Sequence, residues 1–151
     1  MAKVGSKAGW TGNYVESIDA AKTLYASDSG KVFMVTHTGG SESSSGGYTI
    51  TLPTPSAAGV GWTAIFIVNC AAGSTLSDEA SEDVVFNDGQ SDKMVTMYED
   101  ANNNVLADDA TDTIAFDNTA LKGDWLSFFS DGTTWFANGQ SGSNTGVLVA
   151  T

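Results

Sequence analysis

The sequence predicts an all-β fold: an antiparallel β-sandwich, a jelly-roll-like fold or a small barrel, with an extended N-terminal arm. Three observations indicate this class. Short runs rich in β-branched and aromatic residues recur along the 151-residue chain, each bounded by Gly, Asp, Asn or Pro. The chain has 17 Gly but 2 Pro, which suits many turns. Two aromatic segments flank Asp131-Gly132, which predicts a hairpin closed by a type I′ turn.

The N-terminal segment differs from the rest, which predicts an arm over residues 1–22 and one β-rich domain over residues 23–151. Residues 1–22 carry three Lys against two acidic residues, whereas residues 23–151 carry three Lys against 16 acidic residues. Three Gly within the first 12 residues interrupt any periodic pattern, so an extended conformation is expected there. A helix over residues 15–24 is the one helical alternative, and its β-branched residues weaken it.

From residue 23 onward the pattern predicts a succession of strands. They are expected at residues 32–38, 48–52, 62–68, 84–86, 94–98, 104–106, 113–116, 124–130, 133–137 and 146–150. Apolar residues alternate with Thr over residues 48–52, as in a strand with one buried face. Residues 62–68 are apolar at nearly every position, which predicts a central strand covered on both faces.

The charge of the chain argues against nucleic acid as a partner. Six Lys and no Arg stand against 18 acidic residues, for a formal net charge of −12. Binding to phosphate backbones needs a clustered cationic surface that displaces counterions. The longest apolar run, residues 62–68, is too short to cross a bilayer, and residues 1–14 lack the apolar core of a signal peptide. We therefore expect no nucleic-acid partner and no membrane partner.

The residues that could carry catalysis occur singly. Cys70 ends an apolar strand, where a buried and inert thiol is expected. His37 lies at a strand end without a partner at motif spacing and is interpreted as structural. The chain contains neither a nucleophile elbow nor a Walker A loop. We expect that the protein is not an enzyme.

Three acidic loops raise the question of calcium, because carboxylates are the hard oxygen ligands that Ca²⁺ prefers. They lie at residues 78–83, 99–104 and 108–112. None has the spacing of an EF-hand, and solvated loops on a surface without Arg would have the same composition. The sequence therefore predicts no cofactor and no metal site.

The N-terminal arm carries the candidate binding residues, which are Lys3, Lys7, Trp10 and Tyr14. An exposed Trp in an extended segment suits a buried anchor at an interface, and the lysines suit charges at its rim. Trp10 could equally cap the core of its own subunit. The arm is thus a candidate for binding a capsid surface or a sister subunit.

Three segments of the chain are similar to a known group of proteins. They are residues 22–33 (KTLYASDSGKVF), residues 47–53 (GYTITLP) and residues 123–135 (GDWLSFFSDGTTW). Together they resemble tailed-phage virion proteins, in which such Asp-Ser-Gly, Thr-Leu-Pro and Ser-Asp-Gly-Thr signposts recur in capsid decoration (cement) proteins and tail-fibre modules. The resemblance covers about residues 22–137. It rests on turn and strand signatures, and no catalytic residue is carried over.

The resemblance implies a β-rich homotrimer seated on the outer surface of the capsid in the virion. The partners would be the major capsid protein and further copies of the chain. An acidic exterior would keep virions apart by mutual repulsion. The alternative is a tail-fibre or adhesin-type module that binds glycan, with Trp125, Trp135 and Tyr98 as candidates for stacking on sugar rings.

Overall fold

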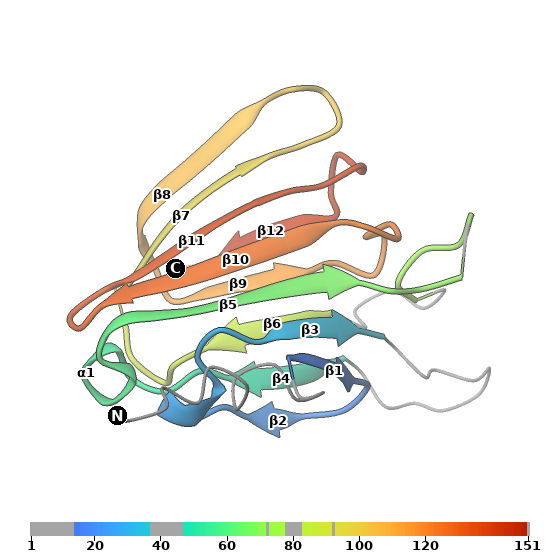
Figure 1. The fold of residues 1–151 in the computed structure, drawn as a ribbon. Helices are drawn as coiled ribbons and strands as arrows, with labels where there is room; N and C mark the ends of the chain where they lie inside the picture. The colour runs from blue at the N-terminus through green and yellow to red at the C-terminus, as the bar shows by residue number, and fades with distance from the viewer. Residues whose placement is uncertain (1–13, 37–46, 72, 78–82, 92, 151) are drawn as a thin grey trace, which may run out of the picture.

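The computed structural model describes residues 14–36, 47–71, 73–77, 83–91 and 93–150 of the chain. These residues form two β-sheets packed face to face (Figure 1). The first, seven-stranded sheet has the order β1 (Val15–Ile18), β3 (Val32–Val35), β5 (Val60–Val68), β10 (Trp125–Asp131), β11 (Trp135–Gln140), β7 (Met94–Glu99), β8 (Val105–Thr111). The second, five-stranded sheet has the order β12 (Val147–Ala150), β9 (Thr113–Phe116), β6 (Val84–Asn87), β4 (Tyr48–Thr51), β2 (Lys22–Thr23).

The all-β sandwich predicted from the sequence is confirmed, but its two sheets are mixed rather than antiparallel throughout. In the first sheet β3 pairs in parallel with both β1 and β5, and β11 pairs in parallel with β7. The chain explains this, because β4 lies between β3 and β5 in sequence but belongs to the other sheet. A chain that crosses between sheets can return in the direction in which it left, which makes neighbouring strands parallel.

Aromatic rings from both sheets form the core. The Phe66 ring of β5 lies 4.7 Å, centroid to centroid, from the Phe86 ring of β6, in the opposite sheet. Phe128 of β10 lies 5.2 Å from the same Phe86 ring. Trp62 and Trp135 meet edge to face at 5.0 Å and are fully buried. These contacts hold the sheets together, since aromatic pairs add to the free energy gained by burying their surface.

The structure corrects the expectation that the strand at residues 62–68 is covered on both faces. Burial alternates along β5: Phe66 and its inward neighbours are buried, whereas Thr63 and Ile65 are exposed. Its inward face alone packs against the second sheet. The outward face of this apolar strand is therefore open in the single chain.

The body of the fold begins earlier than the sequence predicts. Residues 15–18, expected in the arm or in a weak helix, form the edge strand β1, with Ile18 buried. β1 pairs in parallel with β3, and this pairing satisfies its backbone. Residues 1–13 of the predicted arm lie outside the described residues. One short helix, α1 (Pro55–Ala58), was not expected; Pro at its first position and a Thr54 hydroxyl that accepts from the Ala57 N–H explain it.

A cluster of charges joins the edges of the two sheets. The Glu16 carboxylate of β1 accepts hydrogen bonds from the Lys22 ammonium of β2, at 2.5 Å, and from the Lys31 ammonium, at 3.1 Å. Lys31 also donates to Asp28, at 2.6 Å, in the 3₁₀ turn η2 (Ala26–Asp28). The bond from Lys22 holds the pKa of Glu16 below its usual range. The cluster thus ties β1 to β2 across the open side of the sandwich.

The hairpin predicted near the C-terminus is confirmed as β10 and β11, but its turn is not type I′. Ser130 pairs with Trp135, which leaves four residues in the connection. Gly132 has a positive φ of 91°, whereas Asp131 does not, as a type I′ turn would require. The Asp131 carboxylate instead accepts hydrogen bonds from the N–H groups of Thr133 and Thr134. This local capture of backbone N–H groups favours the wider turn.

Candidate association surface

The outward face of the seven-stranded sheet is apolar across most of its width. One register row crosses all seven strands through Val15, Val32, Ile65, Ser127, Asn138, Met97 and Ala107. The next rows add Met34, Ile67 and Trp125 on one side, and Phe129, Phe136 and Val95 on the other. These residues together are named the outer face. Ser127 and Asn138 interrupt the apolar residues in the middle row, but exposed apolar side chains gathered on one face mark an interaction site more often than single ones do.

Large side chains on the outer face stand open to solvent. The exposed fractions are 39% for Ile65, 54% for Met97, 44% for Phe129 and 38% for Phe136. The Phe129 and Phe136 rings lie side by side on paired strands, with centroids 6.2 Å apart. Burying such side chains stabilises a complex by roughly 25 cal/mol for each Å² removed from water. The outer face therefore favours association.

Acidic residues lie at the margins of the outer face. Glu99 and Asp131 end strands β7 and β10, and Asp109 lies in the edge strand β8. An apolar centre with a charged rim is the usual anatomy of a protein interface.

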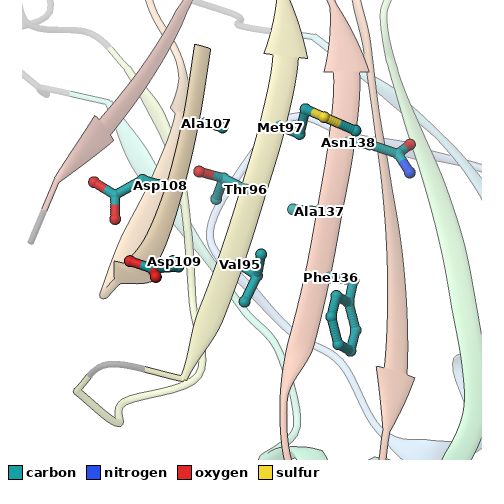
Figure 2. Close-up of a pocket in the computed structure, with 9 residues that line it drawn as sticks. All are labelled: Val95, Thr96, Met97, Ala107, Asp108, Asp109, Phe136, Ala137 and Asn138. Atoms are coloured by element: carbon teal, nitrogen blue, oxygen red, sulfur yellow. The ribbon is translucent and has the colours of Figure 1, made fainter. Parts of the chain in front are cut away.

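An open groove of about 710 Å³ runs over β7, between β8 and β11. Figure 2 shows Val95, Met97 and Phe136 on the β7 and β11 side of the groove and Asp109 on its β8 side, whereas the Asp108 carboxylate points away from β7. The groove thus has an apolar floor and an acidic wall. This combination suits an occupant that presents apolar and basic side chains together.

Strand β8 borders the groove, and its first three residues are covered on neither face. Val105 and Leu106 are consecutive, so their side chains point to opposite sides of the strand, yet 64% and 40% of them are exposed. β8 is also the last strand of its sheet and leaves one row of backbone groups unpaired. Figure 1 shows β7 and β8 standing out from the body of the molecule. An uncovered edge strand of this kind is a template for pairing with another chain.

The structure places one of the four binding residues predicted from the sequence. Tyr14 is 55% exposed and immediately precedes β1, and its carbonyl oxygen accepts a hydrogen bond from the Val32 N–H at 2.7 Å. The other three, Lys3, Lys7 and Trp10, lie outside the described residues. Because β1 and β8 are opposite edges of the sheet, Tyr14 is remote from the groove.

The aromatic residues considered for glycan stacking are placed differently. Trp135 is fully buried and its indole N–H donates to the Pro53 carbonyl oxygen at 3.2 Å. Tyr98 is 7% exposed, so both side chains belong to the core and neither can stack on a sugar. Trp125 is half-buried on the outer face. The exposed rings of this face are Phe129 and Phe136, which sequence reasoning missed.

The single Cys is less buried than expected. Cys70 is half-buried, and its thiol donates to the Ser74 carbonyl oxygen. His37 lies outside the described residues. Within the part of the chain that the structure describes, no group of three or more His, Cys, Asp or Glu side chains is arranged to hold a metal ion. In the loop after β7, Asp100 accepts hydrogen bonds from Asn102 and Asn104 in its own turn.

Among the described residues, no helix has both the length and the apolar character needed to cross a bilayer. No family model, curated protein or solved structure matches the chain. What the chain does is therefore inferred from its own residues.

Proposed function

We propose that this chain is a structural virion protein: a capsid decoration (cement) protein that binds the outer surface of a tailed-phage head as a homotrimer and stabilises it. The outer face of the seven-stranded sheet is the observation that carries the proposal, because four large apolar side chains stand exposed on it, on four neighbouring strands. Contact with sister subunits and with the major capsid protein would cover them. The proposal assigns no catalytic step, and function lies in the interfaces.

Symmetry makes weak contacts sufficient for this role. When three copies are joined, each attachment to the shell raises the effective concentration of the other two for their own sites. Moderate contacts then add up to stable attachment without a large interface for each copy. A rigid sandwich with an apolar face suits such repeated, shape-dependent binding.

Charge also supports a place on the outside of a head. The net charge of −12 gives coated particles a like-charged exterior, which opposes their aggregation. The chain has no Arg, the residue that most often recognises phosphate and guanine, so packaged nucleic acid would repel it.

The test is co-sedimentation of the purified protein with empty phage heads. We expect saturable binding, with bound copies in multiples of three per site. The double variant Phe129→Ser, Phe136→Ser should bind at least tenfold more weakly, a loss of about 1.4 kcal/mol. Leu148→Ser is the matched control, because Leu148 is 40% exposed on the other sheet and should leave binding unchanged. Failure of the wild-type protein to bind heads at saturable stoichiometry would contradict the proposal.

The second candidate function is glycan binding by a tail-fibre or adhesin-type module. The groove between β8 and β11 favours this function. The Phe136 ring and the Asp109 carboxylate lie on opposite sides of the groove, and Asn138 also lines it; together they suit the apolar face and hydroxyl groups of a sugar. A glycan array distinguishes the two functions. If the wild-type protein binds one glycan selectively, loses this binding in Phe136→Ser and does not bind phage heads, the decoration proposal is wrong and glycan binding takes its place.

A further inference from the structure

We propose that, in the trimer, residues 1–13 of one copy lie in the groove between β8 and β11 of the next copy. Trp10 packs on the apolar floor of that groove, and Lys3 and Lys7 face its acidic wall. The inference deepens the proposed function and rests on its homotrimer. The sequence leaves three roles open for the arm, which are attachment to the shell, attachment to a sister subunit and packing of Trp10 on its own core, and the inference assigns the second.

Charge complementarity is the first argument. Residues 1–13 carry two Lys and no acidic residue, whereas the remaining 138 residues carry four Lys and 18 acidic residues. The segment is thus the one basic stretch of a strongly acidic chain. The groove offers the Asp109 carboxylate on its β8 side, and Val95, Met97 and Phe136 on the other. A segment that carries both basic and apolar residues matches both sides.

The reach of the chain decides between a subunit's own groove and its neighbour's. Four strand spacings separate β1 from β11, the nearer side of the groove floor, which at about 4.8 Å each amounts to about 19 Å. Trp10 precedes Tyr14 by four residues, which extend over at most about 14 Å. Trp10 therefore falls short of the groove floor of its own subunit. If β8 of a second copy lies beside β1, the floor is two strand spacings away, about 10 Å, and Trp10 reaches it.

The positions of the arm and of the groove on the subunit also fit a closed ring of three copies. The arm leaves from β1 at one edge of the sheet, and the groove borders β8 at the opposite edge. Two different patches on opposite edges form a head-to-tail contact, which closes when three copies are related by a threefold axis. Every arm is then bound and every groove is filled. The contact also covers β8, whose Val105 and Leu106 are exposed on both faces of the single chain.

Cross-linking between two differently tagged chains tests the inference, in a Cys70→Ser background that removes the native thiol. One chain carries Thr11→Cys, beside Trp10, and the other carries Ala107→Cys, in the exposed wall of the groove. A short bismaleimide should join the two chains into a covalent dimer in high yield. Leu148→Cys on the outward side of the other sheet is the control partner and should give less than a tenth of that yield.

Light scattering on the same samples separates the failure of this inference from that of the proposed function. A trimer in which Thr11→Cys joins Ala107→Cys of another chain supports the inference. A trimer with no such link, or with a link formed equally well to Leu148→Cys, overturns the inference and leaves the decoration role standing. A chain that is monomeric at every concentration overturns both.

A charge variant adds a second readout. Lys7→Glu should raise the dissociation constant of the trimer at least tenfold at low salt, because it opposes Asp109 of the neighbouring copy. The same change at Lys122, an exposed lysine outside the groove, alters the net charge equally and should have no such effect. Equal weakening by both variants would show that net charge alone matters and would overturn the assigned contact.

Discussion

At the scale of single residues, two aspartates each accept three hydrogen bonds, and burial decides how much these bonds contribute to the free energy of unfolding. Asp124 accepts from the Ser141 hydroxyl and from the N–H groups of Gly142 and Leu121, and it is 5% exposed. Asp131 also accepts three bonds, all from Thr133 and Thr134, but it is exposed. Donors left without a partner cost free energy where water cannot reach them.

We therefore expect Asp124→Ala to lower the free energy of unfolding by about 3 kcal/mol, since three donors lose a buried acceptor. Asp131→Ala should cost much less, because water replaces the lost acceptor in the exposed turn. Urea denaturation of both variants against the wild-type chain measures the difference. Equal losses would contradict the view that Asp124 organises a buried junction of loops.

At the scale of elements, the sequence predicts most strands closely because alternation and turn residues are local signals. The strand expected at 113–116 is β9, and the strand expected at 48–52 is β4 with one residue fewer. β8 is longer than the 104–106 expected, since its two central Asp residues resemble a turn. They are tolerated because an exposed edge strand does not bury them. Pairing partners are not local, so parallel neighbours could not be read from the pattern.

The edge strand β1 owes part of its attachment to charge, and this gives a prediction with a pH signature. Glu16→Gln should lower the free energy of unfolding by about 1 kcal/mol at pH 7, as for a partly exposed ion pair with two lysines. The pKa of Glu16 is lowered in the folded state, so its contribution is present above the ordinary value of 4.5 and is lost as the pH falls through the lower, folded value.

Urea denaturation at pH 7 and at pH 3 measures this signature, and Asp19→Asn, an exposed acid next to the same strand, is the control. The gap between Glu16→Gln and wild type should narrow at the lower pH, whereas Asp19→Asn should follow the wild type at both. A gap that is the same at both pH values would show that the carboxylate charge does not matter.

At the scale of the whole molecule, the candidate surface could not be predicted from the sequence. Ile65, Phe129 and Phe136 come from three strands, and strand register alone brings them together. The apolar run at residues 62–68 did signal more apolar surface than one face of a strand needs. It was interpreted as burial on both faces within one chain, whereas the structure covers one face and leaves the other exposed.

For the N-terminal arm, the sequence predicts the binding residues but not what they bind. Its composition predicts that Trp10 and the lysines are binding residues, but their proposed target depends on the distance across a folded sheet. Without the strand order there is no reason to prefer a neighbouring copy to the residue's own subunit. The groove, the free edge of β8 and the position of Tyr14 together supply that reason.

The most direct test of this account is the molar mass of the full-length chain in solution, measured by light scattering over a range of concentrations. A chain that works through its outer face and arm should have a mass near three times 15.6 kDa, and the Phe129→Ser, Phe136→Ser variant should shift toward one chain. A wild-type mass of a single chain at every concentration would contradict the account.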